Sequence, residues 1–345
     1  MLALNSGLKS SLLTLLFLTA IVSGCIRSKG ENENRTKKAI NVTDFRGREL
    51  NFDKPAVRIV CLIESALSGI YMLGAEDKIV GISSNVYNDN VAAQYASLDE
   101  RIKNKAILAP GNWDFVNIES VVALKPDLVI LWSSQVESIQ AIESKGIPVY
   151  AVMLKSTGDV YKEISDLGKL TGKQIRADSL IQYTKDELST LVITNTKFQK
   201  EKKKVYFIWP QGPLETSGQN STVNELITMA GAKNVCNSPD EHIVVNLEKV
   251  IEWNPDIIIM WYDANKNPED IMKLSGWSNI KAVKEKKVFE LPSVFFCDLW
   301  TLKFQYASKL LSTWCYPSVF KSNDLDKEKH QMILKLYGEK GEFIK

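Results

Sequence analysis

The sequence predicts an α/β protein with two α/β lobes, each built around a mainly parallel central sheet and joined by one long helix. The first observation is an internal repeat: residues 116–132 read VNIESVVALKPDLVILW and residues 245–261 read VNLEKVIEWNPDIIIMW. Eight of these 17 positions are identical at a constant offset of 129 residues, a spacing that suits two similar lobes better than a solenoid. The second is a stretch from residue 173 to about 203 without glycine or proline, which predicts a helix of about 45 Å.

The repeated segment predicts a helix, a tight turn and a buried strand, once per lobe. An asparagine in each copy can cap the helix by accepting an N–H bond one turn in, and a first-turn glutamate suits the helix dipole. A proline then ends the helix, because the residue before it avoids the α region. These pairs are Asn117 and Asn246, Glu119 and Glu248, and Pro126 and Pro255. The apolar runs that follow lack alternation, which indicates parallel strands buried on both faces.

Apolar runs separated by turn residues predict the other elements. In the first lobe we expect a turn between short strands at 44–47, longer strands at 58–63, 79–83, 127–132 and 147–152, and a helix at 65–73 that Gly74 ends. In the second lobe we expect strands at 204–209, 256–261 and 288–291, and helices at 223–230 and 299–314.

This pattern divides the chain into an N-terminal lobe, connecting helices and a C-terminal lobe. The corresponding residues are 39–156, 157–203 and 204–345. One long helix between the lobes would allow only limited hinge motion. The sequence does not give the extent to which the lobes close.

The first 38 residues do not belong to either lobe. Only Lys9 is charged before an apolar run from residue 12 to 22, which is too short to span a bilayer and has the length of a signal-peptide core. The run ends in Val-Ser-Gly before Cys25, which resembles a lipobox; an ordinary signal peptide with an incidental cysteine is the alternative. We therefore expect a signal peptide at 1–24, a lipidated flexible tether at 25–38 and attachment to the outer face of the cytoplasmic membrane.

Composition excludes several classes of function. With 43 Lys and Arg against 41 Asp and Glu, the chain has no strongly basic character with which to bind nucleic acid. Two histidines, and no CxxC or HExxH pattern, make a zinc site or a common catalytic site a poor fit, so we name no metal ligand and no catalytic residue.

Four cysteines follow Cys25. These are Cys61, Cys236, Cys297 and Cys315. They allow three disulfide pairings, between which the sequence does not choose. Cys61 lies within an apolar strand run, which favours a buried thiol. Three N-glycosylation sequons are also present, but their use depends on the host.

The two repeated segments resemble a motif of a known family. Other similar segments are Gly47-Arg48, Leu73-Gly74-Ala75, Val80-Gly81-Ile82, Thr216-Ser217-Gly218 and Tyr316-Pro317-Ser318-Val319-Phe320. Together with the lipobox, they resemble the class III substrate-binding proteins of ABC importers for ferric siderophores, haem and cobalamin, over about residues 40–340. The resemblance implies two α/β lobes joined by one long helix, with a ligand cleft between them. Glu64-Ser65 stands where family members often have Pro-Ser, so the fold transfers better than the ligand.

The resemblance also gives roles to two groups of residues. It implies that Glu119 and Glu248 lie at the exposed tips of the lobes and pair with arginines of the permease; as plain structure, each is a first-turn acid. In cobalamin-binding relatives, tryptophans occur at the positions of Trp113 and Trp132, but the second also occurs in siderophore binders. The family resemblance further implies a monomer without a cofactor of its own.

Aromatic residues gather where the predicted strands end, which is where α/β folds bind ligands. They are Trp132, Trp209, Trp261 and Tyr262, with Trp113 and Trp300 in loops expected nearby. Such rings offer flat walls to a large chelate, whereas packing between the lobes is the alternative interpretation.

The leading hypothesis is capture of a ferric siderophore for an ABC importer. Cobalamin or another corrinoid, and haem, are close alternatives. A molybdate-type oxyanion is less favoured, because it predicts a basic, polar cleft. From other classes, an exported enzyme or a surface adhesin stays open, although the two histidines lie in no catalytic motif.

Overall fold

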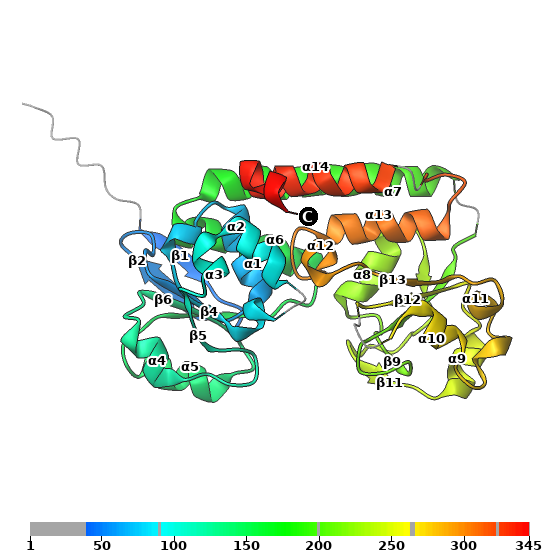
Figure 1. Ribbon diagram of the computed structural model, residues 1–345, viewed down its shortest axis with the longest axis horizontal. Coiled ribbons are helices and arrows are strands. Elements are labelled where there is room, and N and C mark those ends of the chain that lie inside the picture. The colour runs from blue at the N-terminus through cyan, green and yellow to red at the C-terminus, as the bar shows by residue number, and fades with distance from the viewer. Residues whose placement is uncertain (1–38, 89–90, 199–200, 263–265, 322–323, 345) are drawn as a thin grey trace, which may run out of the picture. The chain divides into compact units, whose positions relative to one another are not determined.

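The computed structural model describes residues 39–88, 91–198, 201–262, 266–321 and 324–344 (Figure 1). The predicted signal peptide and tether, with Cys25, lie outside these residues. Within the described part, no helix combines the length and apolar character needed to cross a bilayer.

The first lobe is built on a five-stranded parallel sheet in the order β5-β4-β3-β6-β7. Its strands are β3 (Ile59–Cys61), β4 (Ile79–Ser83), β5 (Leu108–Gly111), β6 (Leu128–Trp132) and β7 (Val149–Val152). The residues of β3 and β7 are buried throughout, as the lack of alternation predicts. Helices lie around this sheet: α1 (Glu64–Met72), α2 (Ala92–Leu98), α3 (Glu100–Lys103), α4 (Ile118–Ala123) and α5 (Val136–Glu143).

A short antiparallel hairpin precedes this sheet. It pairs β1 (Ile40–Thr43) with β2 (Glu49–Phe52), and the predicted turn lies between them. Gly47 has a φ of +81°, a conformation that glycine adopts without a steric penalty. The Asp44 carboxylate accepts the backbone N–H groups of Arg46 and Arg48, which closes the turn.

The second lobe has a four-stranded parallel sheet in the order β10-β8-β12-β13. These strands are β8 (Lys204–Ile208), β10 (Lys233–Asn234), β12 (Ile257–Met260) and β13 (Val288–Glu290). β9 (Glu215–Thr216) pairs antiparallel with β11 (Ile243–Val244) in a separate two-stranded sheet, and β9 contacts β8. The helices are α8 (Thr222–Met229), α9 (Leu247–Trp253), α10 (Pro268–Met272), α11 (Lys281–Lys284), α12 (Val294–Cys297) and α13 (Phe304–Cys315).

The two copies of the repeat fold alike. Each repeated strand, β6 or β12, pairs in parallel with the first strand of its sheet, Ile59 facing Leu128 and Val205 facing Ile257. The residue before each proline lies in the left-handed region, Lys125 with φ +48° and Asn254 with φ +44°. The helix therefore passes into the strand through a connection of four residues in the first lobe and three in the second.

Two helices connect the lobes, and the end of the chain returns to the first. α6 (Thr157–Thr171) packs on α7 (Gln174–Phe198), whose 25 residues span about 37 Å. α14 (Leu325–Tyr337) then packs against α1, where the hydroxyls of Ser68 and Tyr337 lie 2.7 Å apart. The sequence analysis did not predict this return.

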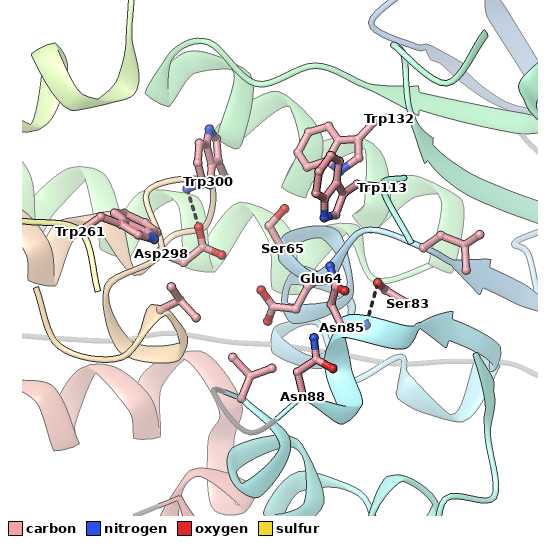
Figure 2. Close-up of a pocket in the computed structure, with 13 residues that line it drawn as sticks. Glu64, Ser65, Ser83, Asn85, Asn88, Trp113, Trp132, Trp261, Asp298 and Trp300 are labelled. Carbon is pink, nitrogen blue, oxygen red and sulfur yellow. Dashed lines mark hydrogen bonds between the residues drawn. The ribbon is translucent and has the colours of Figure 1, made fainter. Parts of the chain in front are cut away.

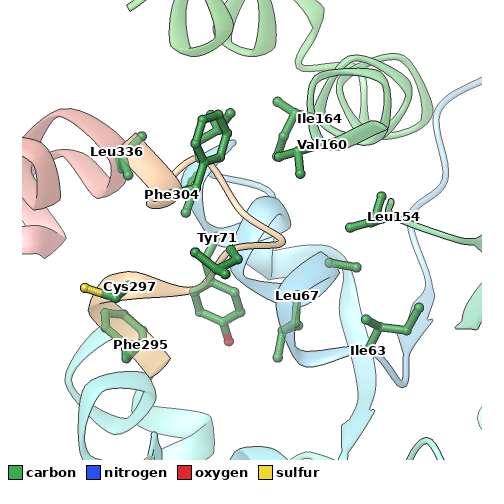
Figure 3. Packing of buried hydrophobic residues seen from close by; sticks show 14 of the residues in the cluster. Ile63, Leu67, Tyr71, Leu154, Val160, Ile164, Phe295, Cys297, Phe304 and Leu336 are labelled. Carbon is green, nitrogen blue, oxygen red and sulfur yellow. The ribbon is translucent and has the colours of Figure 1, made fainter. Parts of the chain in front are cut away.

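The apolar core is continuous across the lobes. Figure 3 shows Leu67 and Tyr71 of α1 beside Phe295 and Phe304 of the second half of the chain. Tyr95 of α2 meets Phe295 edge-on, with ring centroids 5.5 Å apart. Residues 39–344 thus pack as one unit, and the predicted boundaries between lobes and connecting helices stay a prediction.

The predicted fold class is confirmed, with three corrections to the elements. The long helix expected from residue 173 to about 203 is α7, Gln174–Phe198, and residues 201–203 are not helical. β5 was not predicted, and the helix expected at 299–314 begins at Phe304. Its first part is a turn instead, because the Asp298 carboxylate accepts the Trp300 N–H and Thr301 Oγ1 donates to the Asp298 carbonyl. The four described cysteines are all buried and form no disulfide: Cys61, Cys236, Cys297 and Cys315. Burial raises the pKa of the Cys61 thiol, which is typical of an unreactive, structural cysteine.

Candidate functional site

A cavity of about 490 Å³ lies where strands of both sheets end. From the first lobe come residues after β3, β4, β5 and β6, and from the second lobe residues after β12 and β13. The lining comprises Leu62, Glu64, Ser65, Ser83, Asn85, Asn88, Val91, Trp113, Trp132, Trp261, Val294, Asp298 and Trp300. The cavity occupies the position in which α/β folds bind ligands.

Four tryptophans from the two lobes share this cavity (Figure 2). Trp113 and Trp132 stand on the first-lobe side, and Trp261 and Trp300 on the other. Trp113 is 60% exposed, whereas Trp261 is only 9% exposed. The structure therefore brings together four of the six aromatic residues predicted for the cleft at the ends of strands and in nearby loops.

Trp209 and Tyr262 do not line the cavity. The Trp209 ring, 8% exposed, lies behind Trp300 and stacks parallel to it with centroids 6.1 Å apart. On its other face it stacks against His242 at 6.0 Å, and its indole N–H donates to Ser217 Oγ at 2.9 Å. Trp209 supports the wall that Trp300 presents. This ring stack joins three distant segments of the chain. It explains the position of the Trp209 side chain better than the alternation of side chains along a strand does.

Two carboxylates line the cavity as well. Glu64, in the first turn of α1, accepts a 2.5 Å hydrogen bond from Tyr95 Oη. Asp298 accepts a hydrogen bond of 2.8 Å from the backbone N–H of Trp300. Burial, aided by the negative charge of Glu64, raises the pKa of Asp298 to about 7. The Lys303 ammonium and the Trp300 N–H act in the opposite direction.

Lys303 is buried close to these two carboxylates and does not line the cavity. Its ammonium stands 4.3 Å from the centre of the Phe295 ring. Its charge interacts with Glu64, Asp298 and the Tyr337 hydroxyl.

Sequence reasoning noted Glu64 and Ser65 only as a departure from a family pattern, and it missed Asp298. The signal was available, because Asp298 precedes one of the predicted aromatics by two residues. It was hidden by the expectation that a helix begins at residue 299. Across the described residues, no group of three or more His, Cys, Asp or Glu side chains is arranged to hold a metal ion.

Neither Glu119 nor Glu248 lines this cavity; they lie in the first turns of α4 and α9. Figure 1 shows both helices at the ends of the lobes that face away from α7 and α14. The Asn117 and Asn246 side chains accept the N–H of Ser120 and Lys249, so each helix is capped as predicted. Both glutamates are exposed, and neither has an ion-pair partner within the part of the chain that is described.

A family model described as periplasmic binding protein matches residues 59–295, more than half of the chain. The chain belongs to the periplasmic binding protein family. This confirms the family resemblance found in the repeat, and the arrangement of two parallel sheets around a shared cavity fits it.

Three relatives illustrate the family, and two of them are named for different ligands. An ABC transporter substrate-binding lipoprotein of Bacillus subtilis is 27% identical over 290 residues, covering 80% of this chain and 87% of its own. The molybdate-binding protein MolA of Haemophilus influenzae is 29% identical over 326 residues, covering 86% and 90%. Its molybdate-bound structure matches with a TM-score of 0.75 at 26% identity, over 86% of this chain and 97% of that one. A vitamin B12-binding protein of Vibrio parahaemolyticus is 21% identical over 246 residues, covering 70% and 83%.

Proposed function

We propose that this protein is the solute-binding component of an ABC import system and captures a metal chelate in the tryptophan-lined cavity. The observation that carries the proposal is that Trp113 and Trp132 of one lobe share a cavity with Trp261 and Trp300 of the other. Its volume of about 490 Å³ lies within the usual range of small-molecule sites. Flat apolar rings suit a bulky chelate, which brings its own ligands to the metal.

A ferric siderophore remains the leading ligand. A corrinoid or haem would use the same aromatic walls, and the exposed Trp113 supports the corrinoid. The similarity to a molybdate-binding protein makes an oxyanion the second candidate. The lining opposes it, because it contains Glu64 and Asp298 and no Lys, Arg or His. An oxyanion would meet like charges there instead of compensating ones.

Docking and anchoring complete the proposal. Glu119 and Glu248 are exposed at equivalent positions of the two lobes, which suits pairing with two arginines of a permease. Charges of this kind guide encounter and orientation more than they add affinity. Lipidation of Cys25 would hold the exported protein at the outer face of the cytoplasmic membrane.

The proposal is tested by titrating the full chain, purified in detergent, with ferric siderophores, haem, cobalamin and molybdate while tryptophan fluorescence is recorded. We expect quenching by a chelate and no response to molybdate. Trp113→Phe should reduce the quenching, whereas Trp253→Phe should not, because Trp253 packs on Tyr206 away from the cavity. The absence of quenching and of a thermal shift with every chelate would refute chelate binding.

A further inference from the structure

Two carboxylates, Glu64 and Asp298, form the floor of the cavity. Binding of an apolar chelate by aromatic walls would not require their negative charge. We propose that the natural ligand bears a positive charge, and that Glu64 and Asp298 bind its cationic group while the tryptophans hold its body. This inference rests on the proposed function, since it takes the cavity to be the ligand site.

Each of the two carboxylates is held by one oxygen. Tyr95 Oη donates to Glu64 Oε1, and the Trp300 N–H donates to Asp298 Oδ1. The second oxygen of neither carboxylate has a hydrogen-bond partner among the described residues. Figure 2 shows both groups directed toward the space between the tryptophans of the two lobes. The side chains are thus fixed in place while one oxygen of each is available to a ligand.

An unsatisfied hydroxyl beside them is independent evidence of a polar ligand group. Ser65 is only 6% exposed, it lines the cavity, and its Oγ has no hydrogen-bond partner in the described part of the chain. Figure 2 shows this hydroxyl between Glu64 and the first-lobe tryptophans. A buried hydroxyl without a partner is costly, so a ligand that bonds to it relieves a cost that the unliganded protein carries.

The charges around the floor do not cancel. Lys303 is the buried cation that interacts with both carboxylates, and it offsets one of the two negative charges when both are ionised. Glu163 also faces Asp298, but burial and the charge of Asp298 raise its pKa to about 8, which keeps it mainly protonated at neutral pH. With Asp298 ionised, which its pKa of about 7 allows above neutral pH, one negative charge remains for the ligand to balance. A cation removes this imbalance, whereas an anion enlarges it in a site where water screens poorly.

The aromatic walls favour the same sign of charge. The faces of tryptophan rings carry negative potential and attract ammonium or guanidinium groups placed over them. Carboxylates and indole faces on one cavity thus select a cationic chelate over a neutral or anionic one of similar size.

A matched pair of ligands tests this inference. Ferrioxamine B carries a free ammonium group, and its N-acetylated form lacks that charge while keeping the same ferric centre. Titrating the full chain with both, we expect at least about tenfold tighter binding of the cationic form at pH 8, equivalent to about 1.4 kcal/mol. For the corrinoid alternative, aquacobalamin and cyanocobalamin form such a pair at neutral pH, because alkaline pH removes a proton from the cobalt-bound water and with it the charge.

The variants Glu64→Gln and Asp298→Asn should bring the two affinities close together by weakening only the cationic ligand. Glu137→Gln, an exposed change at the start of α5, is the matched control and should keep the preference. Two results would overturn the inference: equal affinity of the unaltered protein for the charged and the neutral member of a pair, or tighter binding of the neutral member. Either result would leave chelate binding itself intact. Failure to bind any chelate would refute the proposed function itself. The comparison of two ligands on the unaltered protein needs no variant to fold.

Discussion

The two lobes present the same backbone unit to the cavity but very different walls. Trp132 and Trp261 end the two copies of the repeat at equivalent positions. Trp261 is buried in a cluster with Trp209 and Trp300, with ring centroids 5.6 and 5.7 Å away. Trp132 is half-buried, and neither it nor Trp113 has an aromatic ring partner among the described residues. The second lobe thus offers a preformed wall, and the first offers rings that a ligand can still cover.

The difference teaches that duplication preserves the frame and not the binding surface. Both copies keep the asparagine cap, the left-handed residue and the aspartate after the proline. Asp127 accepts the Arg58 N–H, and Asp256 accepts the Lys204 N–H, so each ties the repeated strand to the first strand of its sheet. Residues outside the repeat, Trp209 and Trp300 above all, make the second wall rigid. The following predictions test this comparison, from the largest expected effect to the smallest.

Charge reversal at the two lobe tips should have the largest effect. We expect Glu119→Arg combined with Glu248→Arg to abolish uptake while leaving ligand affinity unchanged, because neither glutamate lines the cavity. Each single variant should retain partial uptake, of similar size if the tips contribute equally. Uptake of labelled ligand by cells and titration of the purified variants measure the two quantities. Normal uptake by the double variant would disprove docking through these residues.

Removal of Trp209 should distinguish the rigid wall from the open one. Trp209→Ala deletes a buried ring from a stack, and we expect it to lower the free energy of unfolding by about 3–5 kcal/mol. Trp113→Ala, at an exposed position, should change stability by no more than about 0.5 kcal/mol and should weaken ligand binding instead. Denaturant unfolding and titration of both variants provide the test. Equal losses of stability would show that the two walls do not differ in rigidity.

Stability should fall with rising pH because two buried carboxyls lie where the lobes meet. Burial raises the pKa of Glu163 to about 8, above its ordinary value of 4.5, so the folded state holds a proton that the unfolded state has released. Its contribution is complete below pH 4.5 and is lost as the pH rises toward 8 and above; Asp298, whose pKa is raised to about 7, acts alike. We expect Glu163→Gln to flatten the decline by a few kcal/mol between pH 5 and 9 in denaturant unfolding. An unchanged slope would contradict the protonated state of Glu163.

The helix caps should show the smallest and most equal effects. Asn117→Ala and Asn246→Ala each remove one bond to an N–H of the first helical turn, and we expect each to cost about 1 kcal/mol. Matched losses in thermal unfolding would show that the repeated unit is equally important in both lobes. A loss in one lobe alone would mean that the frame, too, has diverged.

The sequence was sufficient for the frame because its signals are local. The apolar runs, the asparagine caps and the prolines each act within a few residues. They predicted the positions of β3, β4, β6, β8 and β12 to within two residues at each end. β5 escaped because it is an edge strand that contains Pro110, which an edge tolerates and which reads as a turn.

The site was less accessible to prediction because its parts come from distant segments. Four tryptophans could be assigned to the cavity side, two from where strands end and two from loops expected nearby, but nothing near Trp209 in the sequence indicates that it lies behind Trp300. The same is true of Asp298 and Lys303, whose burial depends on packing of the second half of the chain against α1 and α2. The sequence therefore predicted the aromatic walls of the cavity. It did not predict the buried charges near it, because their positions depend on tertiary contacts.

The return of the last helix to the first lobe has a consequence for how the protein acquires its structure. The hydroxyls of Ser68 and Tyr337 meet across 269 residues of chain, and Lys340 forms an ion pair with Glu76 in the same region. The first lobe is then covered only after nearly the whole chain has been made. Contacts of such long range slow folding, because a large loop must close before they form. A chain built in this way stays unfolded longer during synthesis, which is the state in which a polypeptide can be threaded through a membrane.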